Sequence, residues 1–328
     1  MKLSKKMQYA LAAIFAVCAS GSIAHAQETA VPVTATVGAT TSATTSVNPG
    51  IVSNHNGLNL TGAVGLPLNP TANIPNQGSY RVQADYFDLG DIDAKNESGV
   101  GFGSNQKIGD AKFYGVHAAT GIGSRFELSG GVDALRMHGE QNIGSDNDSF
   151  SYDSLDGVGF SVGAKYQAYH STDGTTLVAV GAGYSKALFR NVNAYVVGTK
   201  AFGVGNRSVT GHLGVRYDRF ILKGFDEYDG GEVSFDDDSS KVSVFAGAEV
   251  PLDRSGRFAF VGEIGSRNAE DFNVGDFDFG GPDSRVETKF PFSASVRYAR
   301  NGLAASVGIA RQGVTGDSGL FAQIGKTF

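Results

Sequence analysis

Apolar and polar residues alternate with a period of two over most of the chain after residue 79. In 126–134, apolar Phe126, Leu128 and Val132 are separated by polar Glu127 and Asp133. Neighbouring side chains of a β-strand point to opposite faces, so this alternation predicts strands with one apolar and one polar face. Twelve segments carry the pattern: 79–90, 112–120, 125–136, 157–169, 176–185, 193–200, 208–217, 241–250, 257–265, 289–300, 303–312 and 319–328.

The connections between these segments differ in length in a regular way. Short ones follow every second strand, at 121–124, 170–175, 201–207, 251–256 and 301–302, whereas the others include four long ones, at 91–111, 137–156, 218–240 and 266–288. Short turns at one end and long loops at the other are typical of transmembrane barrels with periplasmic turns and extracellular loops. We therefore expect an all-β fold, an antiparallel up-and-down transmembrane barrel of about twelve strands.

A soluble periplasmic β-sandwich would show the same alternation, but it would have no reason to separate short from long connections. It would also bury larger residues than the alanines and the 46 glycines that fill many positions here. Five of the eight prolines precede residue 80. Because proline cannot donate to a sheet ladder, its scarcity beyond that point favours a continuous sheet.

The first residues have the pattern of a secretory signal. Lys2, Lys5 and Lys6 precede a short apolar run that ends before Ala24-His25-Ala26, a small-residue cleavage pattern. We expect cleavage after Ala26 and export to the outer membrane. The predicted organisation is a signal peptide at 1–26, a flexible periplasmic lead-in at 27–56, a proline-rich segment at 57–78 and the barrel at 79–328.

Composition excludes some functions. Loss of the three signal lysines from the 27 basic residues leaves 24, against 33 acidic residues, and this balance argues against a nucleic-acid partner. The single cysteine, Cys18, lies within the signal, so the exported chain has no disulfide. If the protein lies in a membrane, we expect it to cross as β-strands. The expected partner is then the lipid of the outer membrane.

The polar faces of the predicted strands carry many charges. We expect these to face the lumen, at Arg81, Asp85, Lys112, Glu127, Asp133, Lys165, Arg216, Lys241, Glu249, Arg257, Glu263 and Arg297. Two interpretations remain open. The charges line a hydrated lumen and set its ion preference, or opposite charges pair across strands and close the interior.

The long connections are acidic. They contain Asp236, Asp237 and Asp238 in one loop, and Asp276 and Asp278 in another. Such clusters would concentrate cations at the mouth of a channel. They would also suit divalent cations, or lipopolysaccharide phosphates bridged by such ions, although their usual role is that of a solvated loop.

No catalytic or cofactor chemistry stands out. The histidines beyond the signal are His55, His117, His138, His170 and His212, and none has metal-ligand spacing. The phase of the strands places His117 and His212 on the inward face. A barrel lipid hydrolase would need a Ser–His site, and no Gly-x-Ser-x-Gly elbow is present. We expect no enzymatic activity, no cofactor and no metal site.

The last strand resembles the C-terminal strand of bacterial outer-membrane barrel proteins. Leu320, Ala322, Ile324 and Lys326 share a face with Phe328, where the sequence stops. In that family the last residue is typically phenylalanine, and the resemblance implies recognition by the barrel-assembly machinery. Lys326 departs from the pattern, since an aliphatic or aromatic residue is usual there.

A second resemblance precedes the first strand. Gly65-Leu66-Pro67-Leu68-Asn69-Pro70-Thr71-Ala72, followed by Gly78, is similar to the Gly-Leu…Pro-Thr-Ala…Gly opening of some bacterial barrels associated with exopolysaccharide export. The similarity covers about 25 residues and suggests a relative without fixing a function. The direct role that we expect for these residues is a proline-rigid turn that guides the chain into the barrel.

These features rank three hypotheses. The first is a small outer-membrane channel, or porin, for cations or small polar solutes, because of the charged inward faces and acidic loops. The second is a non-enzymatic structural or export-associated barrel that serves surface polysaccharide or an envelope partner. The third is a barrel lipid hydrolase.

Overall fold

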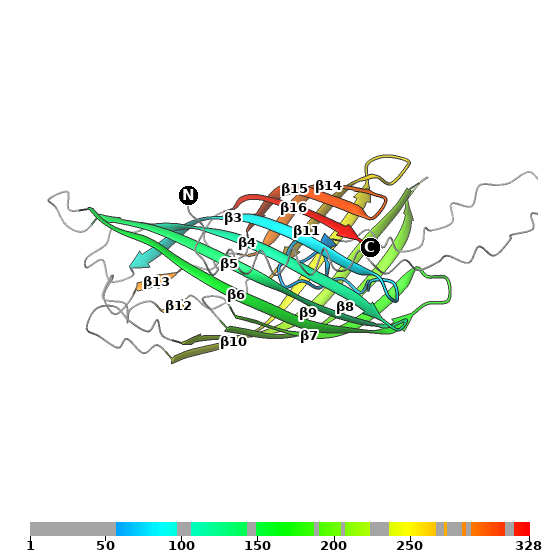
Figure 1. Ribbon diagram of the computed structural model, residues 1–328, viewed down its shortest axis with the longest axis horizontal. Coiled ribbons are helices and arrows are strands. Elements are labelled where there is room, and N and C mark those ends of the chain that lie inside the picture. The colour runs from blue at the N-terminus through cyan, green and yellow to red at the C-terminus, as the bar shows by residue number, and fades with distance from the viewer. Residues whose placement is uncertain are drawn as a thin grey trace, which may run out of the picture. The chain divides into compact units, whose positions relative to one another are not determined.

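A computed structural model describes residues 57–96, 106–142, 149–186, 190–204, 207–223, 236–266, 272–273, 284–286, 290–311 and 318–328. Twelve of its strands form one barrel (Figure 1): β3 Tyr80–Asn96, β4 Gln106–Ile122, β5 Phe126–Asn142, β6 Ser149–His170, β7 Thr176–Lys186, β8 Arg190–Val204, β9 Arg207–Lys223, β10 Asp236–Pro251, β11 Phe258–Gly265, β14 Phe292–Arg300, β15 Leu303–Arg311 and β16 Gly319–Thr327.

Each of these strands pairs antiparallel with its neighbours in chain order, and the sheet closes on itself. The closing seam joins β16 to β3, with Phe321 opposite Phe87 and Thr327 opposite Arg81. Because β3 also pairs with β4, both of its edges are used. Closure removes the exposed edges that an open sheet would leave, which confirms the predicted antiparallel barrel of twelve strands.

Several strands extend farther than the apolar alternation predicts. β6 begins at Ser149, and β9 runs to Lys223, which pairs with Asp236 at the start of β10. The expectation that Asp236, Asp237 and Asp238 belong to a loop is therefore wrong for their backbone, which continues the ladder. Beyond the part of the wall whose outer face is apolar, both faces of a strand contact water. Strand pairing therefore continues there without the alternation of apolar and polar residues.

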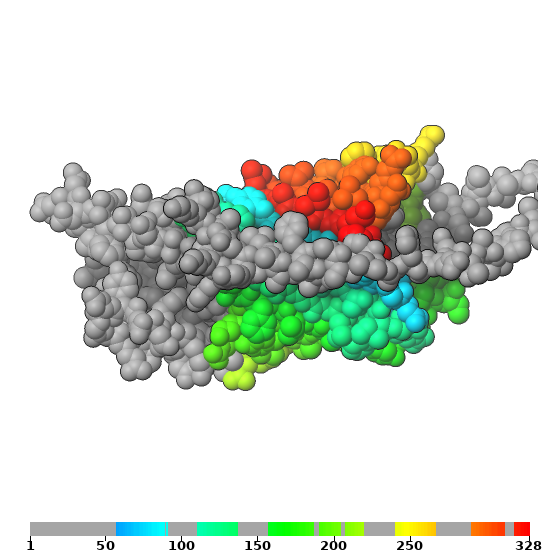
Figure 2. Space-filling view, in the orientation of Figure 1, coloured from blue at the N-terminus to red at the C-terminus, as the bar shows by residue number. Residues whose placement is uncertain are grey.

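The barrel wall is inside out relative to a soluble protein, with polar side chains facing the interior and large apolar side chains facing outward. On β5 the carboxylate-bearing Glu127 is 0% exposed, whereas its neighbour Leu128 is 42% exposed. The same division holds around the wall: Val162, Val196, Val244, Val307 and Ile324 are exposed large apolar residues on five other strands. Figure 2 shows part of this outer surface, with β14 to β16 in orange and red. Such an exterior matches a hydrocarbon environment, since exposed apolar area on this scale is unfavourable in water.

Aromatic pairs mark two levels on the outer face. Near the short turns, Tyr80 stacks on Phe328 across the seam, with ring centroids 5.1 Å apart. Toward the long loops, Tyr86 contacts Tyr114 at 5.3 Å, and a further pair on β6 and β7 lies at 5.7 Å. Tyr80 and Tyr86 are six residues apart on β3, about 20 Å along a strand. Two aromatic girdles around an apolar band are typical of transmembrane barrels.

Four short strands are not among the twelve strands of the barrel wall. β12 Phe272–Asn273 and β13 Ser284–Val286 form a small hairpin on the far end of β3. β1 Gly57–Leu58 and β2 Val64–Gly65 form a separate two-stranded sheet. In the part of the chain that the structure describes, no helix is long and apolar enough to cross a bilayer.

Candidate functional site in the occupied lumen

Residues 57–73 lie inside the barrel, and we call them the lumenal segment. Leu58, Leu66, Thr71 and Ala72 are 0% exposed. Figure 1 shows this stretch in blue between the strands, and its hydrogen-bond partners come from strands all around the wall. Residues 76–78 are exposed again, and Gln77 bridges to Gly121 at the short-turn end before β3 begins. The segment is thus a folded element within the lumen, where a rigid turn before the barrel was expected.

Local sequence explains the compact fold of the segment. The Asn59 side-chain oxygen accepts hydrogen bonds from the backbone N–H groups of Thr61 and Ala63, both at 3.0 Å, and so closes the β1–β2 turn. Gly62 has a φ of +87°, which glycine adopts without strain. At Gly65 a side chain is excluded, because a Cβ there would lie 2.3 Å from the backbone oxygen of Asn69. The motif from Gly65 to Ala72 therefore folds back on itself inside the lumen.

The first anchor of the lumenal segment is Gln83 on β3. Its side-chain Oε1 accepts the N–H of Leu58 at 2.8 Å, and its Nε2 donates to the C=O of Leu58 at 2.7 Å. Gln323 on β16 donates to the same carbonyl at 3.2 Å. One side-chain amide thus satisfies both backbone groups of Leu58, as a neighbouring strand would.

The second anchor is a buried ion pair between β5 and β6. Glu127 Oε2 and Lys165 Nζ lie 2.9 Å apart, and both side chains are almost fully buried. Glu127 Oε1 accepts the N–H of Val64 at 3.0 Å, and Lys165 Nζ donates to the C=O of Val64 at 2.9 Å. Hydrogen bonds of this charge-assisted kind offset part of the desolvation of both charges.

The third anchor is Glu263 on β11. Its Oε1 accepts the N–H of Leu68 at 2.7 Å, and its Oε2 accepts the side-chain amide of Asn69 at 2.8 Å. Arg216 on β9 donates to Asn69 Oδ1 at 3.3 Å. Asn69 is therefore held on both sides of its amide by charged wall residues.

The fourth anchor holds the end of the segment. Thr199 Oγ1 on β8 accepts the N–H of Ala72 at 3.0 Å, and Gln167 on β6 donates to the C=O of Ala72 at 3.0 Å. Thr199 also contacts His212 Nδ1 at 2.9 Å, and His212 Nε2 lies 3.2 Å from Glu249, which binds Arg297 Nη1 at 3.0 Å.

Apolar side chains of the segment fill apolar positions of the wall. The side chain of Leu66 lies in a notch at Gly247, and a Cβ added at Gly247 would lie 2.3 Å from Leu66 Cδ1. Leu68 belongs to a cluster with Phe87 and Phe321, whose rings stack at 4.9 Å. The other clusters inside the barrel join Ala72 to Leu177, Ala179, Tyr195, Val197, Ala201 and Phe245, and Leu58 and Val64 to Ala119. The hydrophobic core of the barrel thus lies between its wall and its own lumenal segment.

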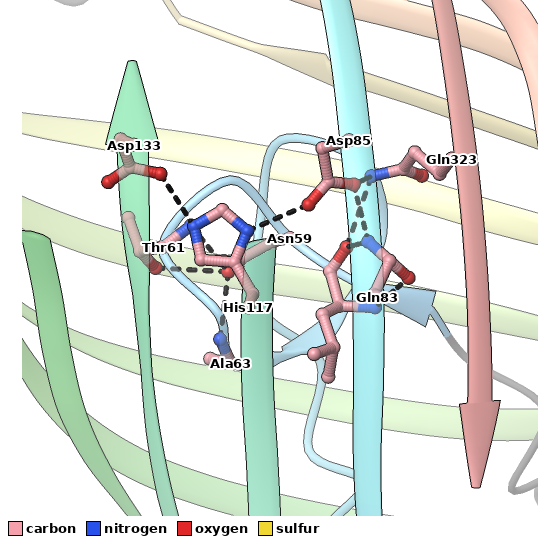
Figure 3. Close-up of polar contacts among 9 residues, drawn as sticks. Asn59, Thr61, Ala63, Gln83, Asp85, His117, Asp133 and Gln323 are labelled. Atoms are coloured by element: carbon pink, nitrogen blue, oxygen red, sulfur yellow. Dashed lines mark hydrogen bonds and ion pairs between the residues drawn. The ribbon is translucent and has the colours of Figure 1, made fainter. Parts of the chain in front are cut away.

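A histidine-centred cluster stands behind the first anchor (Figure 3). His117 is fully buried, with Nδ1 2.7 Å from Asp85 and Nε2 2.8 Å from Asp133. Asp85 Oδ1 accepts the side-chain amides of Gln83 at 2.7 Å and Gln323 at 2.9 Å. An amide NH₂ has two hydrogens, so Asp85 orients both glutamines with the second hydrogen toward Leu58. The cluster therefore positions the groups that hold the lumenal segment.

Most of the charges expected in the lumen do lie there. The buried ones are Arg81, Asp85, Glu127, Asp133, Lys165, Glu249, Glu263 and Arg297, and the inward phase of His117 and His212 is also confirmed. Arg216 and Lys241 share the inward face but are partly exposed. Where these charges are paired, as in Glu127–Lys165 and Glu249–Arg297, they match the interpretation in which opposite charges pair across strands.

Two expected lumen residues lie elsewhere. Lys112 is on the outward face of β4, since Ala111 beside it is buried, and it pairs with Asp110 at 3.4 Å. Lys112 lies on the long-loop side of Tyr114, where the outward face of β4 reaches water, so polarity there does not indicate the inner face. Arg257 is exposed in the turn before β11, beyond the short-turn end of the wall. The side chains of Asp236, Asp237 and Asp238, and all of Asp276 and Asp278, lie outside the described residues.

Sequence reasoning missed the neutral anchors. Gln83, Gln167, Thr199 and Gln323 are all buried and all bind the lumenal segment or its neighbours. Their signal was present, because each occupies an inward position in a strand of alternating pattern. A search limited to charged residues and histidines does not select them.

Comparisons with known proteins add little to this geometry. No protein family and no curated protein matches the sequence. Among solved structures, the KdgM porin is 8% identical, with 76% of this chain and 98% of that chain covered and a TM-score of 0.40. An outer membrane channel from Pseudomonas putida F1 is 12% identical, with 78% and 97% covered and a TM-score of 0.43. The translocator domain of the autotransporter NalP from Neisseria meningitidis is 13% identical, with 77% and 89% covered and a TM-score of 0.42. At these scores the barrel assignment rests on this chain's own strand register.

Proposed function

We propose that the chain is an outer-membrane β-barrel channel for small polar solutes, with a preference for cations. The observation that carries the proposal is the inside-out wall, apolar toward the surroundings and charged toward the lumen. Glu127 beside Leu128 is the clearest case, with exposures of 0% and 42%. A polar interior with an apolar, girdled exterior is the arrangement of barrels that conduct polar solutes across a membrane.

The lumenal segment occupies the interior of this proposed channel. Its anchors come from β3, β5, β6, β8, β9 and β11, so it spans the interior from one side of the wall to the other. Twelve strands enclose a lumen intermediate between filled eight-stranded barrels and open porins of sixteen strands or more. Conduction therefore requires that the segment move or that a path remain beside it.

The test is the single-channel conductance of the refolded chain in a planar bilayer, with a salt gradient to report ion preference. We expect reproducible steps with cation preference, because the exported chain has 24 basic against 33 acidic residues, with acidic groups near its long connections. Replacement of Asp236, Asp237 and Asp238 together by Asn should reduce that preference. Unchanged selectivity would remove these residues from the mechanism.

A second candidate is a non-enzymatic structural or export-associated barrel for an envelope or surface-polysaccharide partner. The filled lumen favours it, since wall charges such as Glu127, Lys165 and Glu263 hold the lumenal segment and need no conducted solute. Lipopolysaccharide or divalent cations at the acidic connections, and the barrel-assembly machinery at Phe328, belong to this proposal as partners. A correctly inserted barrel that remains silent, and that co-purifies with an envelope partner, would replace the channel by this candidate.

A further inference from the structure

The wall recognises the backbone of the lumenal segment more than its side-chain functional groups. At Leu58, Val64 and Ala72 both the N–H and the C=O are bound by wall side chains, at distances between 2.7 and 3.0 Å. Each pair of contacts combines one acceptor with one donor, as a β-strand neighbour would. Such donor–acceptor pairs fit any peptide that brings an amide to the same place.

The side-chain contacts add selection to this backbone recognition. The seats for Leu66 and Leu68 are the Gly247 notch and the Phe87–Phe321 cluster. The seat for Ala72 is a larger apolar cluster that includes Tyr195 and Phe245. A site with backbone contacts and spaced apolar seats has the features of a peptide-binding site.

The lumenal segment is also independent of the wall's ladder. β1 and β2 form a separate sheet, and none of the twelve wall strands forms a ladder with them. Departure of the segment therefore breaks side-chain contacts and leaves every wall strand paired. Residues 74–78 keep it tethered to β3 at the short-turn end.

We propose that the barrel lumen is a peptide-binding site, that residues 57–73 occupy it as a removable stopper, and that the same peptide supplied in trans can take their place. This inference rests on the proposed channel function only for its conductance readout. The ligand class is a peptide that adopts the turns and the leucine spacing of the lumenal segment.

The test begins with Gly65→Val in the full chain. A Cβ at Gly65 would lie 2.3 Å from Asn69 O and 2.8 Å from Pro70 Cα. The substitution therefore prevents the stopper from adopting its fold and changes no residue of the barrel wall. Amide exchange across 57–73, measured by mass spectrometry, should accelerate at least tenfold. The matched control is Gly203→Val, because a Cβ at Gly203 meets nothing within 4 Å.

A labelled synthetic peptide of residues 57–73 is then added to each barrel. It should bind the Gly65→Val barrel at least tenfold more tightly than the Gly203→Val barrel, whose site is filled, and it should close any conductance that the first substitution opens. The same peptide carrying Gly65→Val should not bind. If Gly65→Val fails to fold, Leu68→Asp provides the second variant, since it places a carboxylate against Glu263 and the phenylalanine cluster.

The outcomes separate the two proposals. Peptide binding without any conductance would retain the peptide site and reject the channel. Conductance in the released barrel without peptide binding would retain the channel and overturn the peptide site. Unchanged amide exchange in both folded variants would also overturn it, because the stopper would then be a fixed part of the wall.

Discussion

The Glu263 anchor gives the sharpest test of what holds the lumenal segment in place. Glu263→Gln keeps the size of the side chain but replaces one carboxylate oxygen by an NH₂ group. Oε1 accepts from Leu68 N–H and from the Ser293 hydroxyl, both at 2.7 Å, and Oε2 accepts from Asn69 Nδ2 at 2.8 Å. Every partner is a donor, so the new NH₂ must face a donor in either orientation.

The expected magnitude follows from these contacts. A hydrogen bond to a charged group contributes about 1.5–3 kcal/mol, and at least one is lost while its donor stays buried. We therefore expect the free-energy difference between the released and the bound segment to fall by about 2–3 kcal/mol. The fraction of molecules with a released segment then rises roughly 30- to 150-fold. The wall strands should keep their pairing, since Glu263 makes these contacts through its side chain alone.

The assay is amide exchange of peptides covering 57–73, measured by mass spectrometry on the full chain in detergent micelles or bilayer discs. Exchange limited by opening should accelerate by the same factor. Glu249→Gln is the matched control, because the carboxylate of Glu249 is also buried and binds His212 and Arg297 on the wall. Exchange within threefold of the unsubstituted chain, or equal acceleration in the control, would refute the assigned role of Glu263.

Two further predictions concern a buried and an exposed charge. His117→Leu leaves Asp85 and Asp133 buried without their shared partner, so the free energy of unfolding in urea should fall by about 3–5 kcal/mol; addition of Asp85→Asn and Asp133→Asn should restore part of it, and no restoration would contradict the ion-pair reasoning. In the turn after β6, hydrogen bonds from the Ser171 hydroxyl and from Thr175 lower the pKa of Asp173 from 3.8 to about 2. Because the folded pKa is below the unfolded one, this stabilisation is present above about pH 3.8 and is lost as pH falls through about 2. An NMR titration of the carboxyl carbon should report that pKa, and a midpoint near 3.8 would contradict the hydrogen-bond assignment.

The sequence by itself determined the wall of this protein. Strand pairing in an up-and-down barrel is local, since each strand meets the next one along the chain, and the period of two reports which face each residue takes. All twelve predicted strands are present. The inward phase of Glu127, Lys165 and His117 was readable for the same reason. Errors arose on the long-loop side of the aromatic residues, as at Lys112, where water on both faces removes the link between polarity and direction.

Only the tertiary structure decided what fills the lumen. Residues 57–78 have no periodic pattern, and their turns at Asn59, Gly62 and Gly65 specify a compact segment without specifying where it lies. Its place is set by wall groups scattered along the whole chain: the carbonyl of Leu58 binds Gln323, 265 residues away. Those groups converge only when the sheet closes at the β16–β3 seam. The sequence shows which charges face inward, but whether they meet water, one another or a peptide depends on that closure.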